Sequence, residues 1–236
     1  MNSFGQALSA YHEGDRDACF VIARDDGFTQ AVPVKVFFET GSLPELESRA
    51  LRLCQGEVLD IGSAAGRHSL ALSQQGLAVW SLDILPEAQI ILGERGLPHP
   101  VLGDALSWAE RSFDTVLMLM NGIGLVGTPA GLDRFLRHAH RLVSPGGQIL
   151  CDSIDVSKTE EPIHIAHHRR NREWGLYPGQ QRFRIQYGEV WGEFFDWLHL
   201  DFDSLSRHGW AAGWECQLID EEPEGRYLAR MIAVDL

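Results

Sequence analysis

The chain has 236 residues, of which 44% are hydrophobic, so it is long enough to bury a sizeable core in one large domain or two small ones. Its 33 Asp and Glu residues outnumber its 20 Lys and Arg residues, which gives a net charge of -13 at pH 7. This balance excludes the broad positive field with which proteins bind the phosphate backbone of nucleic acids, and we expect no nucleic-acid partner.

The four cysteines lie far apart and form no Cys-x-x-Cys pair, so neither a zinc ribbon nor a dithiol site is indicated, and we predict no metal. Residues 1–16 lack the basic and apolar pattern of a signal peptide, and no apolar run approaches the roughly 20 residues of a membrane helix. We therefore expect a cytoplasmic protein without a membrane partner.

Residues 1–54 are expected to form an N-terminal cap, with an amphipathic segment first, then a polar loop at 24–27 and a helix over 43–54. Residues 55–156 alternate apolar strands with amphipathic helices, which is typical of a parallel sheet joined by crossover helices. We predict strands in this core over 57–61, 78–83, around residue 101, 115–120 and 148–154. We predict helices over 67–75, 86–96 and about 132–143, the last ending at the breaker Ser144-Pro145-Gly146-Gly147.

Residues 157–200 are predicted to be an inserted loop, with histidines on its surface, followed by a β-hairpin over 181–199 that turns at Gly188-Glu189 and forms a lid. Residues 201–236 are predicted to add a helix over 203–211 and strands over 214–219 and 226–234. The expected fold is α/β: a three-layer, doubly wound, mainly parallel sheet of seven strands with an antiparallel last strand. The hairpin is inserted after the fifth strand, and residues 1–236 form one domain.

The turn after the first strand of the core predicts a ligand site, because it reads Asp60-x-Gly62-x-Ala64-x-Gly66 and opens a helix. Small residues there let the backbone approach a ligand at the carboxyl edge of the sheet. The dinucleotide fingerprint Gly-x-Gly-x-x-Gly does not fit, since counting from Gly62 puts Ala64 and Arg67 at its second and third glycines. The spacing therefore argues against a bound pyrophosphate.

The same turn resembles the first motif of class I S-adenosylmethionine-dependent methyltransferases, Asp-x-Gly-x-Gly-x-Gly, with Ala64 in place of the middle glycine. Three further landmarks follow in the order that this family shows: Asp83-Ile84, Gly103-Asp104-Ala105 and Asn121. The resemblance covers residues 50–156 and, more loosely, the last two strands. It does not reach the hairpin.

The resemblance implies that the cofactor is S-adenosylmethionine and gives each landmark a role. The turn with Asp60, Gly62, Ala64 and Gly66 would hold the methionine part of the cofactor. Asp83 would accept the two ribose hydroxyls, and Ile84 would pack on the adenine ring. Asp104 and the amide of Ala105 would bind the edge of the adenine, and the main-chain carbonyl of Leu119 and the side chain of Asn121 would meet the amino group.

Methyl transfer from a sulfonium is an in-line displacement, so the protein mainly has to align the reacting atoms and exclude water. Some acceptors also need a general base. The candidates for a catalytic side chain are Asn121, His164 and Tyr187, none of which stands out. We expect a small-molecule acceptor, because the chain offers no basic groove for a polyanion. Two alternative functions stay open: an NAD-dependent oxidoreductase and a non-catalytic cofactor-binding protein. The oligomeric state also stays open, with a homodimer as one alternative.

Overall fold

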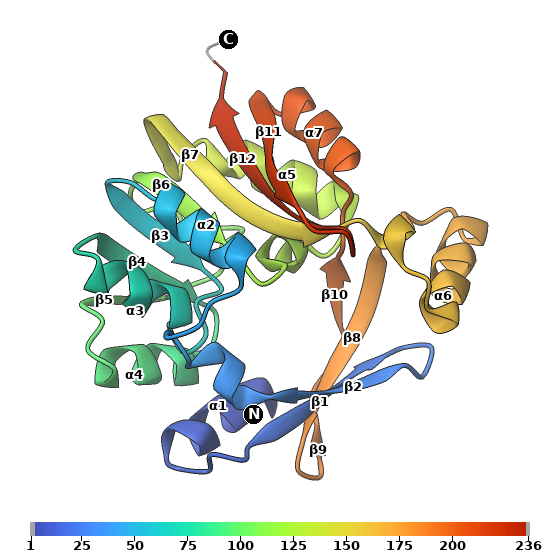
Figure 1. Ribbon diagram of the computed structural model, residues 1–236, viewed down its shortest axis with the longest axis horizontal. Coiled ribbons are helices and arrows are strands. Elements are labelled where there is room, and N and C mark those ends of the chain that lie inside the picture. The colour runs from blue at the N-terminus through green and yellow to red at the C-terminus, as the bar shows by residue number, and fades with distance from the viewer. Residues whose placement is uncertain (1–2, 235–236) are drawn as a thin grey trace. The chain divides into compact units, whose positions relative to one another are not determined.

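The computed structural model describes residues 3–234 and has an α/β fold (Figure 1). One sheet is mixed, with seven strands in the order β11-β12-β7-β6-β3-β4-β5, and the other has five strands, with the path β10-β8-β1-β2 and β9 paired to β8. The chain divides into two compact units. The first comprises the N-terminal segment up to Leu43, Glu57–Trp108 and Arg182–Phe195, and the second comprises Pro44–Gly56, Ala109–Gln181 and the segment from Asp196.

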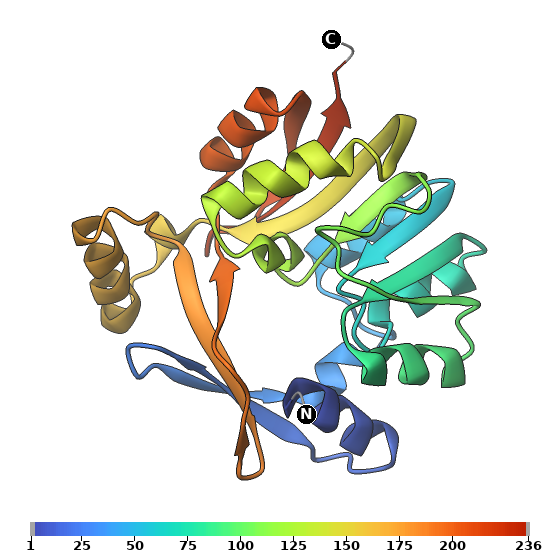
Figure 2. The same ribbon diagram turned by 180° about the vertical axis from the view of Figure 1, so that it is seen from behind.

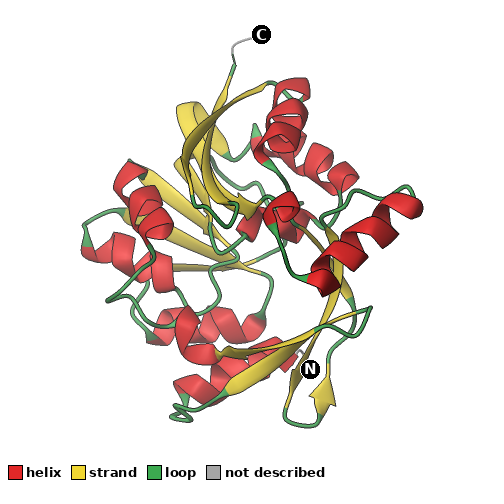
Figure 3. Cartoon of the chain, turned by 45° about the vertical axis from the view of Figure 1, so that its right-hand side comes forward, coloured by secondary structure: helices red, strands yellow, loops and turns green. Residues whose placement is uncertain are grey.

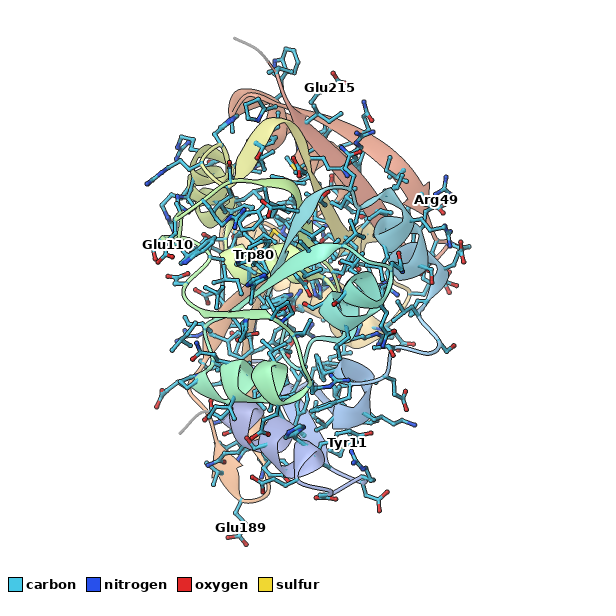
Figure 4. The ribbon with its side chains drawn as sticks, turned by 90° about the vertical axis from the view of Figure 1, so that its left-hand side faces the viewer. Tyr11, Arg49, Trp80, Glu110, Glu189 and Glu215 are labelled. Carbon is cyan, nitrogen blue, oxygen red and sulfur yellow. The ribbon has the colours of Figure 1, made fainter. Side chains whose placement is uncertain are left out.

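The first unit contains the parallel strands that precede the predicted ligand site. β3 (Glu57–Ile61) pairs with β4 (Ala78–Asp83), and β4 pairs with β5 (His99–Leu102). α3 (Arg67–Gln74) and α4 (Pro86–Glu94) connect them, and Pro86 at the first position of α4 suits a helix start. The side chain of Trp80, labelled in Figure 4, stacks on His99 with ring centroids 4.2 Å apart. The predicted strands and helices of this region are confirmed, with α4 ending two residues early.

The five-stranded sheet joins the hairpin to strands that the sequence analysis missed. β1 (Cys19–Arg24) pairs antiparallel with β2 (Thr29–Pro33) and with β8 (Gln180–Tyr187). β8 turns into β9 (Val190–Trp191), and Glu189 lies at the tip of this turn (Figure 4). The second arm of the hairpin is interrupted, since β10 (Phe195–Leu198) begins only after a break. Of the hairpin predicted over 181–199, the structure shows β8 paired with the short β9, while the predicted continuous second arm is interrupted.

The N-terminal segment shares one hydrophobic core with the first unit's ligand turn. α1 (Ser3–His12) packs against α4 and against the 3-10 helix η1 (Val34–Phe37), and Figure 2 shows α1 from behind. The buried cluster combines residues of α1, β1, α4 and the turn: Ala7, Leu8, Ala18, Phe20, Val34, Phe38, Ala64, Ala65, Leu85, Ala88, Ile91, Leu92 and Leu97. Ala64 and Ala65 of the turn after β3 are therefore packed in this core and shielded from solvent.

The second unit holds the other strands of the seven-stranded sheet. Figure 3 distinguishes the strands of the chain, in yellow, from its helices, in red. β6 (Phe113–Met118) pairs parallel with β7 (Val143–Ile154), and β12 (Arg226–Ala233) is antiparallel to both β7 and β11 (Trp214–Glu221). The antiparallel last strand is thus confirmed. The helices of this unit are α2 (Glu45–Leu53), α5 (Pro129–Ala139), α6 (Pro162–Glu173), α7 (Phe202–Ala211), and the 3-10 turns η2 (Gly122–Val126) and η3 (Val156–Lys158).

Three predictions in the second unit need correction. β6 begins at Phe113 and ends at Met118, so it lies two residues earlier than predicted. The helix predicted over about 132–143 is α5, which ends at Ala139, and β7 begins at Val143, so the predicted breaker lies within the strand and does not precede it. The predicted inserted loop contains α6, in which His167 and His168 are only 2% and 6% exposed, so these histidines do not belong to the surface.

His167 is buried for a structural reason. Its Nε2 atom lies 2.9 Å from the carbonyl oxygen of Gln180 and 3.1 Å from Nδ2 of Asn171. The Asn171 amide also donates to the carbonyls of Pro178 and Gln180, so α6 is fastened to the chain that enters β8. These contacts satisfy backbone groups that would otherwise be buried without partners. Among residues 3–234, no helix combines the length and the apolar character that a membrane crossing requires.

Candidate functional site

The turn after β3 has an alternating backbone conformation that explains the spacing of its small residues. The φ angles of Gly62, Ala64 and Gly66 are +71°, +47° and +81°, so every second residue lies in the left-handed region. Glycine adopts that region without strain, whereas alanine does not. A Cβ on Gly66 would also lie 2.7 Å from Leu92 and 2.8 Å from Leu97, so a larger residue here would be strained at this φ and would force these leucine side chains to shift.

Asp83, at the end of β4, connects the three turns of the first unit that carry predicted cofactor residues. Its Oδ2 atom accepts from the amide of Ala64 at 2.8 Å, and its Oδ1 atom accepts from the amide of Leu85 at 2.9 Å. Its main-chain carbonyl accepts from the amide of Gly103 at 2.9 Å. Burial raises the pKa of Asp83 above its ordinary value, although the donating amides lower it. A carboxylate retains further lone pairs, so Asp83 can still accept hydroxyl donors of a ligand.

Asp60, the last polar side chain of β3, belongs to a buried hydrogen-bonded chain. The hydroxyl of Ser81 donates to Ser69 at 2.8 Å, and Ser69 donates to Oδ2 of Asp60 at 2.5 Å. Burial raises the pKa of Asp60, while the electrostatic interaction with His68 and the hydrogen bonds from Ser69 lower it. Ser69 and Ser81 were missed from the sequence, because serines in a helix and a strand carry no local signal of a shared network.

Two apolar side chains at the carboxyl ends of β4 and β5 are exposed to solvent. Ile84 directly after β4 is 65% exposed, and Leu102 at the end of β5 is 45% exposed. Asp104 accepts from the amide of Leu106 at 2.9 Å, which fixes the turn after β5, and Ala105 in the same turn is buried. Two exposed apolar side chains near carboxylates suit a flat ligand ring with polar edges.

Two arginines attach the N-terminal segment to the turn after β3. Arg67 is buried and donates to the carbonyl of Val36 at 2.7 Å, so this helix-start residue has a structural role. Arg95 donates to the carbonyl of Ala65 and, at 2.8 Å, to that of Phe38, and its guanidinium lies over the Phe38 ring. Burial lowers the pKa of Arg95 from its very high ordinary value. Sequence reasoning found neither contact, because their acceptors are backbone carbonyls.

In the second unit, the predicted residues after β6 form a second strained turn. Met120 and Asn121 have φ angles of +62° and +58°, so two consecutive non-glycine residues are left-handed. The amide of Asn121 donates to Oδ1 of Asp152 at 2.7 Å, and this holds the turn against β7. Within residues 3–234, the side-chain oxygen of Asn121 is buried and has no hydrogen-bond partner. Leu119, whose carbonyl was the predicted contact, is buried directly before the turn.

Asp152 is the residue of this region that the sequence analysis missed. It is almost fully buried, and Arg226 donates to its Oδ2 atom at 3.1 Å. Burial raises the pKa of Asp152 to about 6, against the lowering effects of Arg226 and of the Asn121 amide. A signal was available, since a lone aspartate inside the apolar run of β7 is unusual for a strand buried on both faces.

The other candidates for a catalytic side chain have different surroundings. Tyr187 ends β8, and burial together with its bond to Asp15 raises the pKa of its hydroxyl, which disfavours the phenolate that a base would need. His164 lies half-buried in α6. The structure thus brings the predicted residues 60–66, 83–84 and 104–105 to the carboxyl ends of adjacent parallel strands in the first unit. Leu119 and Asn121 follow β6 in the second unit.

A family model and a solved structure that match this chain are both described as methyltransferases. A family model described as a methyltransferase domain matches residues 59–151. A SAM-dependent methyltransferase from Bacteroides fragilis, solved in complex with S-adenosyl-L-homocysteine, has a TM-score of 0.87 and 30% identity, and the match covers 99% of this chain and 95% of that one. No curated protein sequence matches the chain.

More distant structures share the fold. A sugar N-methyltransferase from Streptoalloteichus has a TM-score of 0.55 at 14% identity, with coverage of 80% of this chain and 85% of that chain. A glycopeptide N-methyltransferase in complex with S-adenosylmethionine has a TM-score of 0.56 at 16% identity, with coverage of 80% and 94%. At these identities the likeness concerns the fold.

Proposed function

Because this chain belongs to the class I S-adenosylmethionine-dependent methyltransferases, we propose that it transfers the methyl group to a small-molecule acceptor by in-line displacement. The enzyme class and the cofactor follow from the family. The observation that supports the cofactor site best is the left-handed turn after β3, whose Ala64 amide is bound by the carboxylate of Asp83. Neither an NAD-dependent oxidoreductase nor a non-catalytic protein is favoured.

We propose the following roles for the residues of the site. The turn from Asp60 to Gly66 holds the methionine part of the cofactor, where Gly62 and Ala64 leave room for it. The carboxylate of Asp83 accepts the ribose hydroxyls, in addition to the two amides that it already binds. The exposed side chain of Ile84 packs on the adenine.

The remaining contacts of the proposed site lie after β5 and β6. Asp104 and the amide of Ala105 bind the polar edge of the adenine, because both belong to the turn that follows β5. The carbonyl of Leu119 and the side-chain oxygen of Asn121 accept from the amino group of the cofactor. Both are acceptors, which is what an ammonium group requires.

When bound, S-adenosylmethionine supplies an activated methyl group on a sulfonium, which the acceptor atom takes up as S-adenosylhomocysteine is released. The chain's own contribution is to bind and orient the two molecules and to exclude water. A small-molecule acceptor is favoured because the net charge of -13 opposes a polyanion. Two proteins of the same fold are named as N-methyltransferases, so this fold accommodates an amine acceptor.

The experiment is a methyl-transfer screen over small amines, phenols and thiols, with S-adenosylhomocysteine formation as the readout. We expect methyl transfer to at least one of these three classes of acceptor. The matched control is Asp83→Ala, whose cofactor affinity should fall by about 1–3 kcal/mol, the scale of a lost hydrogen bond to a charged group. Turnover on RNA or protein substrates but on no small molecule would overturn the proposal. Whether the chain forms a homodimer stays open, and sedimentation velocity tests it.

A further inference from the structure

The turn after β6 carries a conformational cost that needs an explanation. Met120 and Asn121 are both left-handed, which costs roughly 1–2 kcal/mol for a residue such as Met120, whereas asparagine tolerates this conformation better. The amide of Asn121 donates to the carboxylate of Asp152 at 2.7 Å, which ties the turn to β7, and the Asn121 carbonyl accepts from the amide of Gly124 at 2.9 Å. Strain of this kind persists where the surrounding structure fixes it, and it is frequent at ligand sites.

The same turn buries an acceptor atom without a donor. Among the described residues, the side-chain oxygen of Asn121 is shielded from solvent and has no hydrogen-bond partner. A buried unpaired acceptor costs about 1–3 kcal/mol, so a ligand that brings a donor would recover that free energy. S-adenosylmethionine brings three kinds of donor: ribose hydroxyls, the adenine amine and the amino group of its methionine part. The proposed function gives the amino group to Asn121.

Asp152 is the group that fixes this arrangement, and we propose that it is a positioning residue. Its carboxylate holds the Met120–Asn121 turn so that the side-chain oxygen of Asn121 accepts a hydrogen bond from the amino group of S-adenosylmethionine. This inference rests on the proposed function, because it assigns Asn121 to the cofactor.

The charged groups around Asp152 make the strength of its hydrogen bond to the Asn121 amide dependent on pH. Arg226 of β12 lies 3.1 Å from Asp152, and it also lies 3.9 Å from Glu47 of α2 and 3.9 Å from Glu222. One guanidinium therefore meets three carboxylates. Burial and Glu47 raise the pKa of Asp152 to about 6, and the neighbouring Cys151 is a neutral thiol, since burial raises its pKa well above the usual range. Protonation of Asp152 weakens the charge-assisted bond to Asn121.

The test compares two ligands by calorimetry: S-adenosylhomocysteine and its deaminated analogue, which keeps the carboxylate but lacks the amino group. We expect Asp152→Asn to weaken the binding of S-adenosylhomocysteine about tenfold, the scale of a lost charge-assisted bond. It should leave the analogue within about twofold, because the analogue brings no donor to Asn121. Circular dichroism checks that each variant is folded.

Two further variants separate positioning from general stability. Asn121→Gly keeps a residue that tolerates the left-handed backbone but removes the oxygen, so it should reproduce the discrimination between the two ligands. Glu47→Gln removes another carboxylate from Arg226 without touching the turn. Measured well above pH 6, where Asp152 is ionised with or without Glu47, it should leave both affinities unchanged. In the wild type, affinity for S-adenosylhomocysteine should fall as the pH drops through about 6, and this dependence should vanish in Asp152→Asn.

The outcomes are distinguishable. Equal weakening of both ligands in Asp152→Asn indicates a structural role and overturns the inference, and so does the absence of any effect. In both cases the wild type still binds S-adenosylhomocysteine, so the proposed function stands. A wild-type protein that binds neither ligand overturns the proposed site and the inference together.

Discussion

A single methyl group distinguishes the turn after β3 from the glycine pattern that it resembles. Ala64 holds a φ angle of +47°, which costs roughly 1–2 kcal/mol relative to glycine. Its methyl group is buried in the core shared with α1 and α4, which returns about 0.8 kcal/mol. The two terms nearly cancel, so the alanine is tolerated at a position where the backbone geometry favours glycine.

We therefore expect Ala64→Gly to leave the free energy of unfolding within about 1 kcal/mol of the wild type, and to keep or tighten the binding of S-adenosylhomocysteine. Urea unfolding and calorimetry measure the two quantities. The contrasting variant is Gly66→Ala, which places a Cβ 2.7 Å from Leu92 at a φ of +81° and should lose about 1–3 kcal/mol. Weaker ligand binding in Ala64→Gly would contradict this account of the turn.

At the scale of elements, hydrogen bonds from arginine side chains connect η1 to the turn after β3. Within residues 3–234, no shared sheet or helix connects the two. Arg95, just after α4, reaches the carbonyls of Ala65 and Phe38. The charged donor is half-buried, and its stem covers the Phe38 ring. A 3-10 turn of four residues is too short to be stable by itself, so its docking depends on these contacts.

Arg95→Ala should therefore loosen η1 while the sheets stay intact. We expect faster hydrogen exchange at the amides of Phe38 and Glu39, which donate to Lys35, with unchanged exchange in α7. Arg16→Ala is the matched control, because Arg16 also lies 4.9 Å over a ring, that of Tyr11, but on the exposed surface. Equal protection in wild type and Arg95→Ala would show that the core packing alone docks η1.

At the scale of the whole molecule, buried aspartates on three strands make stability depend on pH. Burial raises the pKa of Asp60 on β3, Asp83 on β4 and Asp152 on β7. Each group then binds its proton more tightly in the folded chain than in the unfolded chain. The stabilising contribution is therefore complete below the unfolded pKa near 4 and is lost as the pH rises through the folded pKa.

For Asp152 the window lies between the ordinary value of 3.8 and about 6, which corresponds to roughly 3 kcal/mol. Relative to Asp152→Asn, the wild type should lose about this much free energy of unfolding between pH 4 and pH 7. Urea unfolding at several pH values measures the difference. Parallel curves for the two proteins would show that the carboxylate titrates alike in both states. The ionised carboxylate of Asp152 thus lowers the free energy of unfolding. Such a loss of stability is common for ionisable groups at functional sites.

The sequence by itself determined the parallel core, and its resemblance to a known family gave the cofactor. Strand periodicity located β3, β4 and β5, and the residues that follow them meet at one edge because parallel strands end on the same side. Asp60, Gly62, Gly66, Asp83 and Asp104 could therefore be placed from local spacing alone. The roles of Asn121, His164 and Tyr187 in the reaction could not, since methyl transfer demands no fixed catalytic constellation.

Only the tertiary structure decided the rest. It paired β1 with β8 across the length of the chain, with Val21 opposite Gln186, and it buried His167 within α6. It also placed Asp152 beneath the Asn121 turn. The physical reason is common to these cases: hydrophobic periodicity reports which face of a segment is buried, but not which distant segment covers it. Partners far apart in sequence are chosen by packing and by the pairing of buried polar groups.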